Sequence, residues 1–429
     1  MSSFLYPDCK YRGIPFWSWN TKIDDSKIYP QIDAFKEMGM GGFCIHSRVG
    51  LDTEYLGADY MNYVEKSVKY ADEKEMICFL YDEDKWPSGY GGGKVTKEKK
   101  YRSHYLVITP FCQNDREFPE PVYGSKAASV AHGDGEFCIA FYVKLTEEGY
   151  LKRYEVCTED SPEKEGWEKR YVYLEYACDN PWYNNQSYVD TLNPEAVRRF
   201  IDVTYETYYK KLKPYFGKQV PAIFTDEPQF IHKQCLAEPF SKQDVILPFT
   251  YDFAQSFEAE YRIPFFENIP ELLWELPDGK ISRFRYMYHN HVADRFAQAY
   301  SDQIGKWCEE HGIDLCGHVM MEPRLYWQTQ AVGEAMRALR GFQIPGIDML
   351  CDHREYTTAK QAESVAHQRG RKNVLSELYG VTNWDFDFRK HKLQGDWQAA
   401  LGVNVRVHHL AWMSMAGESK RDYPASIGF

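Results

Sequence analysis

The stretch IPFWSWN (residues 14–20), followed by DSKIYPQIDAFKEM (25–38) and GFCIH (42–46), predicts the fold. The first and third segments are short and apolar, as buried strands are. The middle segment repeats its apolar residues at helical spacing, and Gly39 ends it. A strand, a helix and a second strand in this order form one unit of a parallel sheet.

The same rhythm continues along most of the chain. Six further strand candidates follow, at 76–81, 222–225, 313–318, 347–350, 373–376 and 405–410. Helical stretches separate them, at 60–74, 193–213, 249–311 and 358–369. Eight strands with helices between them favour an α/β fold of the (β/α)8 TIM-barrel class. No GxGxxG motif follows the first strand, which disfavours a dinucleotide-binding sheet.

One long segment breaks the rhythm. Residues 98–190 contain alternating, β-branched and aromatic runs such as Tyr105–Thr109 and Tyr171–Tyr176. We expect a small antiparallel β-subdomain here, inserted after the third strand of a barrel built from 1–97 and 191–429. Because the chain stops soon after the eighth strand, we also expect the natural protein to continue past 429.

Composition narrows the function. The 429 residues hold 51 Lys and Arg against 63 Asp and Glu, a formal charge of −12, which disfavours binding to nucleic acid. Aromatic residues make up 16% of the chain, with 33 Tyr and 11 Trp, and flat rings with polar edges suit sugars. The composition therefore favours a carbohydrate partner, and it favours no particular oligomeric state.

The N-terminus and the cysteines suggest a compartment. The first residues lack the basic and apolar regions of a signal peptide, and no apolar run is long enough to span a membrane. The 11 Cys are scattered and form no CxxC motif. We expect buried free thiols in a cytoplasmic protein that does not bind membranes.

Acids, histidines and indoles end the predicted strands. In a TIM barrel the active site lies at the C-terminal ends of the strands, so these residues should meet at one face. We expect substrate contacts from Trp17, Trp19, His46, Arg48, Asp82, Asp84, Trp86, Asp226, His318, Glu322, Tyr379, His409 and Trp412.

Two glutamates are the candidate catalytic residues. Glu227 follows the apolar run of the fourth strand in FTDEP, and Glu377 holds the matching place on the seventh in LSELY. Strands four and seven face each other across a barrel mouth. Glycoside hydrolysis needs two carboxyl groups flanking the scissile bond, one to protonate the leaving oxygen and one to attack or to activate water.

Other readings of the acidic residues stay open. The acids after strand three could supply oxygen ligands for calcium, and Asp352 with His353 could hold a metal. No cofactor motif is present, and we expect catalysis to require none. The alternatives are a non-catalytic carbohydrate-binding barrel and a metal-dependent barrel enzyme, and no HxH motif ends strand one to support the latter.

Three segments resemble a known family. They are PFWSWN (15–20), GGFCIHSRVGL (41–51) and YDEDKWPSG (81–89) with its following glycines, and they resemble the barrel of glycoside hydrolase family 106, which includes α-L-rhamnosidases. The tail at 410–424 is also similar. The resemblance covers most of the barrel, but little of 98–190 and 230–290.

The resemblance implies an inverting hydrolysis by two glutamates, with calcium near the sugar in some members. The strand-four and strand-seven placement also resembles retaining β-glycosidase barrels, in which Asn-Glu-Pro ends strand four and a nucleophilic Glu ends strand seven. By that analogy Glu227 is the general acid and Glu377 the base or nucleophile. Here Asp226 replaces the Asn, so the contact of that Asn with the sugar 2-hydroxyl is not carried over.

Overall fold

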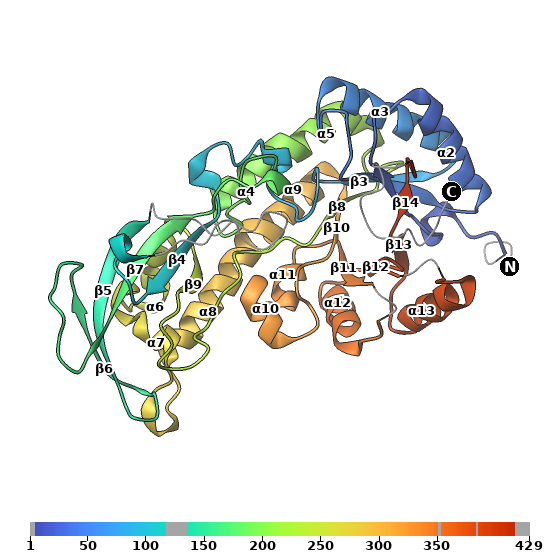
Figure 1. Ribbon diagram of the computed structural model, residues 1–429. Coiled ribbons are helices and arrows are strands. Elements are labelled where there is room, and N and C mark those ends of the chain that lie inside the picture. The colour runs from blue at the N-terminus through green and yellow to red at the C-terminus, as the bar shows by residue number, and fades with distance from the viewer. Residues whose placement is uncertain (1–4, 117–134, 351–352, 383–384, 417–429) are drawn as a thin grey trace.

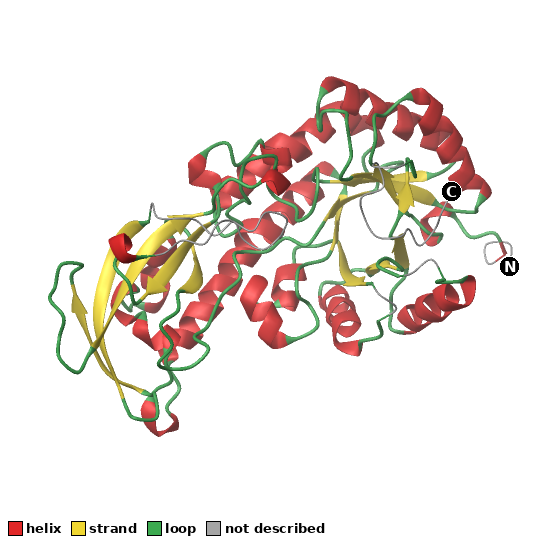
Figure 2. Ribbon diagram, viewed as in Figure 1, coloured by secondary structure: helices red, strands yellow, loops and turns green. Residues whose placement is uncertain are grey.

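The computed structural model describes residues 5–116, 135–350, 353–382 and 385–416. Asp352 and the part of the tail beyond 416 lie outside this range. The described chain forms two sheets joined by long helices, with the parallel sheet at one end of the molecule and an antiparallel sheet at the other (Figures 1 and 2).

The larger sheet is parallel and almost closed. Its order is β13-β12-β11-β10-β8-β3-β2-β1-β14. The strands are β1 (Phe16–Trp19), β2 (Gly42–Ser47), β3 (Ile77–Tyr81), β8 (Ala222–Thr225), β10 (Asp314–Gly317), β11 (Ile344–Met349), β12 (Leu375–Leu378), β13 (Val405–His408) and β14 (Ala411–Trp412). The two edge strands are separated in sequence only by His409 and Leu410, so the sheet curls back on itself into a barrel-like shape.

The sequence analysis predicted the α/β class and the parallel sheet correctly. It placed a single eighth strand at 405–410, whereas β13 pairs with β12 and β14 pairs with β1. A break at His409 and Leu410 thus turns eight predicted strands into nine. The structure shows a nearly closed barrel-like sheet rather than a clearly regular (β/α)8 barrel.

Helices cover the outer face of this sheet (Figure 2). They are α2 (Asp25–Glu37), α3 (Ala58–Glu73), α4 (Pro194–Phe200), α5 (Glu206–Leu212), α9 (Gln303–His311), α10 (Leu325–Ala331), α11 (Ala335–Leu339), α12 (Tyr356–Gln368) and α13 (Phe388–Ala400). Polar side chains cap several of them; Asn193, for example, accepts the backbone N–H of Glu195 just before Pro194 starts α4. In the described ranges, no helix is long and apolar enough to cross a bilayer.

The second sheet is antiparallel, in the order β6-β5-β7-β4-β9. Its strands are β4 (His104–Thr109), β5 (Glu136–Leu145), β6 (Leu151–Cys157), β7 (Glu168–Tyr176) and β9 (Val245–Phe249). The first four lie inside the predicted insertion at 98–190. The fifth, β9, follows β8 in the chain and was missed by the sequence analysis, while the domain division itself stays a prediction.

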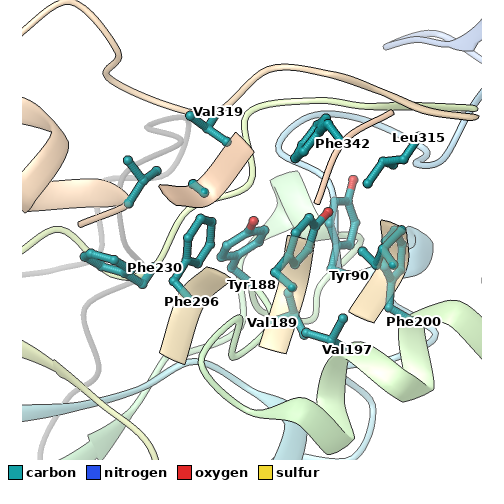
Figure 3. Packing of buried hydrophobic residues seen from close by; sticks show 14 of the residues in the cluster. Tyr90, Tyr188, Val189, Val197, Phe200, Phe230, Phe296, Leu315, Val319 and Phe342 are labelled. Carbon is teal, nitrogen blue, oxygen red and sulfur yellow. The ribbon is translucent and has the colours of Figure 1, made fainter. Parts of the chain in front are cut away.

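One long helical run connects the two sheets. It comprises α8 (Arg283–Phe296), the π-helical turn η10 (Ala297–Asp302) and α9, and α8 lies beside α6 (Phe253–Tyr261) and α7 (Pro270–Leu273) under the antiparallel sheet (Figure 1). Figure 3 shows Phe296 of this run packed beside Phe230 and Tyr188, near Tyr90. Aromatic packing therefore joins this helical run to Phe230, in the segment that follows β8.

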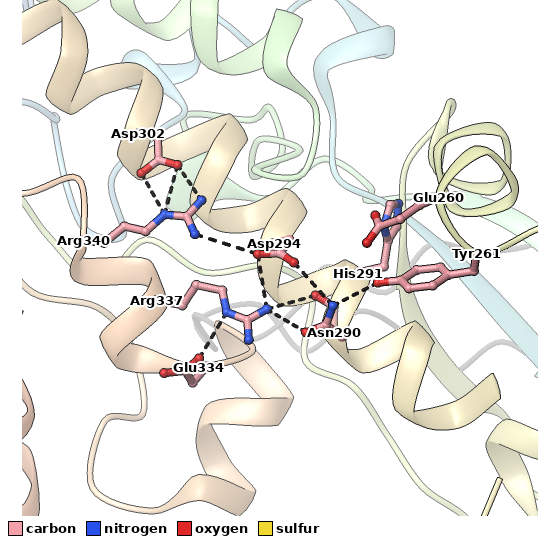
Figure 4. Close-up of polar contacts among 9 residues, drawn as sticks. All are labelled: Glu260, Tyr261, Asn290, His291, Asp294, Asp302, Glu334, Arg337 and Arg340. Atoms are coloured by element: carbon pink, nitrogen blue, oxygen red, sulfur yellow. Dashed lines mark hydrogen bonds and ion pairs between the residues drawn. The ribbon is translucent and has the colours of Figure 1, made fainter. Parts of the chain in front are cut away.

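Ion pairs fasten the short helix α11 to this run. Arg337 pairs with Asp294 at 3.2 Å, and Arg340 pairs with Asp302 at 2.6 Å (Figure 4). All four side chains remain about a quarter to a third exposed, so these pairs are surface features.

Candidate active site

The register of β8 and β10 points polar residues into the mouth. Phe224 on β8 pairs with Cys316 on β10, and both belong to the apolar cluster that fills the barrel. Because alternate residues of a strand point to the same side, Asp226 and His318, two residues further on, point to the inside as well. They lie just beyond the strands, at the C-terminal edge where the mouth opens.

The same alternation explains Glu377. Leu375 on β12 faces the barrel interior and pairs with Gly346 on β11. Two residues later Glu377 pairs with Asp348, so both carboxylates face the mouth. The four neighbouring strands β8, β10, β11 and β12 therefore each contribute one ionisable side chain to the mouth.

Asp226, His318 and Glu377 form one buried cluster. Nε2 of His318 lies 2.8 Å from Oε2 of Glu377 and 3.5 Å from Oδ1 of Asp226. One ligand atom from each of the three lies within 4.8 Å of the others. On its other side Asp226 accepts a hydrogen bond of 2.5 Å from the hydroxyl of Tyr81.

The cluster shifts the protonation of its members. Burial and then the charge of Asp226 raise the pKa of Glu377. Burial lowers the pKa of His318, but its hydrogen bond to Glu377 and the charges of Glu377, Asp348 and Asp226 outweigh burial and hold that pKa well above its ordinary value. His318 therefore favours its protonated form, and its hydrogen bond holds the Glu377 carboxyl group in one orientation.

Two further acids lie beside this cluster. The backbone N–H of Asp348 donates to Oε2 of Glu322 at 3.2 Å. Burial raises the pKa of Glu322 to about 7 and that of Asp348 well above its ordinary value. Oε1 of Glu322 and Oδ1 of Asp348 have no hydrogen-bond partner within the described part of the chain. Such buried oxygens suit the hydroxyl groups of a ligand.

Glu227 follows Asp226 directly and adopts an unusual backbone conformation. Its φ is 47°, in the left-handed region that non-glycine residues rarely occupy. Its charge raises the pKa values of Tyr183, Glu322 and Asp348, so it lies near all three. Strained residues of this kind are concentrated at functional sites.

A second polar chain crosses the mouth from β2 to β13. Nη1 of Arg48 lies 2.9 Å from Nε2 of His46, and Nη2 lies 3.2 Å from Nε2 of His409. The guanidinium sits 4.1 Å from the centre of the Trp86 ring. The imidazole of His46 stacks on Tyr81 at 3.8 Å, which links this chain to Asp226. Of the adjacent histidines on the last strand, His409 is thus the one at the mouth.

Three predicted substrate contacts lie elsewhere. Trp17 and Trp19 are fully buried between β1 and the helices, where Nε1 of Trp17 donates to Gln31 of α2 and Trp19 packs on Tyr60 of α3. Tyr379 is also turned outward and packs on α13. Trp17 and Trp19 alternate with Phe16, which faces the barrel interior, whereas Tyr379 lies just beyond β12 with a φ of 75°, where the alternation of the strand no longer applies. The placement of these three side chains does not support the prediction that they contact substrate.

Trp412 does face the interior. It belongs to the apolar cluster inside the barrel and is 1% exposed. Its Nε1 has no hydrogen-bond partner in the described ranges. We therefore assign it to the floor of the mouth.

The acids after β3 have structural partners. Asp82 points outward and accepts hydrogen bonds from Ser88 at 2.5 Å and from Tyr205 at 2.7 Å. Glu83 accepts backbone N–H groups of the loop at 84–92. Asp84 accepts a hydrogen bond from Asn184 at 2.9 Å. Since these carboxylates already have donors, they are poor candidates for calcium ligands, and calcium binding stays a prediction.

Only one group of described residues has the geometry of a metal site. It is the cluster of Asp226, His318 and Glu377, which offers one nitrogen and two carboxylates. That donor set differs from the all-oxygen set that calcium prefers. The Asp352 and His353 alternative rests on a residue outside the described ranges.

Sequence reasoning missed several residues of the site. Asp348 lies within the predicted sixth strand and Tyr81 at the end of the predicted third strand, but neither was predicted to belong to the site. Asp348 pairs with Glu377 and Tyr81 pairs with Phe224, so the register between neighbouring strands brings both residues to the mouth. Trp182 and Tyr183 come from the predicted insertion, and nothing in their local sequence indicates that they approach the mouth.

Comparisons with known proteins support the fold. No family model matches the chain, and no curated protein matches its sequence. Among solved structures, the chain is similar to a rhamnosidase from Novosphingobium sp. PP1Y, with a TM-score of 0.66 and 14% identity. The match covers 97% of this chain and 56% of the rhamnosidase, so the chain spans little more than half the length of that enzyme.

Proposed function

We propose that this chain is the catalytic part of a glycoside hydrolase that acts on α-L-rhamnosides or related glycosides. The observation that carries the proposal is Glu377, a buried carboxylate held by His318 at a mouth lined with further acids. Several buried ionisable groups with shifted pKa values, gathered in one place, indicate acid–base chemistry. The similarity in fold to a rhamnosidase supports the substrate class.

The proposal includes the finer description of the fold. β13 and β14 are read as two halves of one eighth strand, which makes the sheet a (β/α)8 barrel with a break at its last strand. In that class the active site lies at the C-terminal ends of the strands, where Glu227 and Glu377 are.

We assign the two glutamates different roles. Glu227 donates its proton to the glycosidic oxygen as the bond to the anomeric carbon breaks, so that the leaving group departs as an alcohol. Glu377, hydrogen-bonded to His318, acts in its ionised form and either takes a proton from the attacking water or attacks the anomeric carbon itself. His318 acts through Glu377 and is a positioning residue.

Aryl glycosides test the proposal directly. A panel that includes 4-nitrophenyl α-L-rhamnoside is offered to the wild type, Glu227→Gln and Glu377→Gln. We expect one glycoside to be cleaved and each substitution to lower kcat by about 10³-fold, the scale of lost general acid or base catalysis. Equal rates for all three proteins on a true substrate would show that the glutamates are assigned wrongly.

The same reaction separates two mechanisms. If the first-formed sugar, observed by proton NMR, has the opposite anomeric configuration to the substrate, Glu377 is a base; if the configuration is kept, it is a nucleophile. A non-catalytic carbohydrate-binding barrel is the alternative, and it predicts sugar binding by calorimetry with no cleavage.

A further inference from the structure

Two indole side chains meet at the rim of the mouth. Trp86 belongs to the loop after β3, and Trp182 belongs to the last part of the segment 98–190. Their rings lie edge to face with centres 4.9 Å apart, and Nε1 of Trp182 donates to the backbone oxygen of Trp86 at 2.6 Å. Both side chains keep part of their surface exposed.

Through Arg48, this pair contacts the polar residues of the mouth. The ring of Trp86 contacts the guanidinium of Arg48, which in turn contacts His46 and His409 at the ends of the strands. The loop that carries Trp86 is bonded to the residue before Glu227, since the backbone N–H of Ser88 donates to the oxygen of Asp226 and that of Asp226 donates to Oγ of Ser88, both at 2.8 Å. Trp182 therefore lies on the Glu227 side of the mouth.

The segment that carries Trp182 is held firmly in place. Oδ1 of Asn184 accepts a hydrogen bond of 2.8 Å from Nζ of Lys85, and Nδ2 of Asn184 donates one of 2.9 Å to Asp84. The hydroxyl of Tyr188 donates to the backbone oxygen of Ser88 at 2.7 Å. A ring fixed in this way loses little entropy when a ligand stacks on it. Asp84, predicted to contact the substrate, has a positioning role here.

We infer that Trp182, oriented by Trp86, forms the platform for the leaving group, so that the site selects glycosides whose leaving group carries a sugar or aromatic ring. The inference rests on the proposed function, because it places the platform beside Glu227, the proton donor to the leaving oxygen. A flat apolar ring with a polar edge suits the apolar face of such a group.

Three substrates with one sugar and different leaving groups test the inference. They are α-L-rhamnosyl fluoride, 4-nitrophenyl α-L-rhamnoside and a rhamnosyl-glucose disaccharide, or the corresponding trio for whichever sugar the panel identifies. Fluoride offers no ring to stack. For Trp182→Ala we expect the ratio of kcat/KM for the disaccharide to that for the fluoride to fall about tenfold. Trp182→Phe should restore most of that ratio.

Trp167→Ala is the matched control, because Trp167 is a partly exposed indole next to β7 in the antiparallel sheet, where it contacts Lys164. This variant should leave the ratio unchanged. If Trp182→Ala lowers both rates by the same factor, or lowers neither, the platform is not at Trp182.

A binding measurement separates this inference from the proposed function. By calorimetry on Glu377→Gln, the added Trp182→Ala change should weaken the disaccharide about tenfold more than it weakens free rhamnose. If both sugars bind and Trp182→Ala weakens them equally, the result contradicts the platform but not the proposed function. No binding and no cleavage of any glycoside contradicts the proposed function, and the platform with it.

Discussion

The two sheets bury their charged residues in different ways. In the antiparallel sheet, Arg116 pairs with Glu175 and Asp244, and Arg170 pairs with Glu168 at 2.9 Å. Each of these two buried arginine side chains has an opposite charge beside it. At the mouth of the parallel sheet, by contrast, Asp226 and Glu377 both face His318, with Asp348 and Glu322 close by.

This difference distinguishes buried charges that stabilise the fold from buried charges that suit catalysis. A matched buried pair fixes a local geometry, and removing one partner leaves an uncompensated charge. A group of acids around one histidine costs folding free energy, because burial and mutual repulsion raise the pKa values of its members. Such an arrangement is typical of a site that handles protons.

We expect the largest change in stability when a buried tryptophan is replaced, and a tryptophan at the rim provides the comparison. Trp17→Ala removes a fully buried side chain between β1 and α2, so the free energy of unfolding should fall by about 3–5 kcal/mol. Trp182→Ala, at the partly exposed rim, should lower it by only about 1 kcal/mol. Urea denaturation measures both. If the Trp17 variant keeps full stability but loses substrate affinity, the outward placement of Trp17 is wrong.

Two acids with the same shifted pKa lie on opposite faces of the barrel wall. Burial raises the pKa values of Asp82 and Glu322 to about 7. The folded chain therefore binds more protons than the unfolded chain between about pH 4 and 7, and stability falls as the pH rises through this window. Asp82→Asn and Glu322→Gln should each remove part of this fall, on the order of 3 kcal/mol.

Activity should distinguish those two acids. Only Glu322→Gln should change the pH dependence of kcat/KM, because Asp82 faces the helices and bonds to Tyr205. Thermal unfolding between pH 4 and 8, together with the pH–rate profile, checks both points. A changed profile for Asp82→Asn would place that acid in the chemistry.

The smallest effect belongs to the surface pairs of Figure 4. Arg337→Gln breaks contacts to Asp294 and Glu334, which are partly exposed. The free energy of unfolding should change by less than about 1 kcal/mol, and less in high salt. A loss of several kcal/mol in urea denaturation would mean that α11 depends on these pairs.

Much of the parallel sheet could be predicted because its strands are short apolar runs between amphipathic helices. The strand at 222–225 is predicted to the residue, and α2 to within one residue. The break at His409 and Leu410 could not be predicted, because it depends on how the sheet closes and not on local propensity. Strand β9 was missed for a similar reason, since it pairs with β4, far away in the sequence.

The site was predictable where strand ends carry polar residues. Asp226, His318, Glu377, Arg48 and His409 meet as expected. Trp17 and Trp19 were misplaced because the position after a strand was considered without the alternation within it. Trp182 depends on the path of a segment whose contact with the mouth is set by tertiary hydrogen bonds.

Paired substitutions test the central claim most directly. Glu377→Gln and Glu175→Gln each neutralise one buried glutamate, one at the mouth and one in the antiparallel sheet. The kcat on the cleaved aryl glycoside and the free energy of unfolding are measured for both. Glu377→Gln should lose about 10³-fold in kcat and change stability by less than about 1 kcal/mol. Glu175→Gln should keep its kcat and lose about 3 kcal/mol of stability. The opposite pattern, with stability lost at Glu377 and kcat retained, would contradict the assignment of the mouth as an active site.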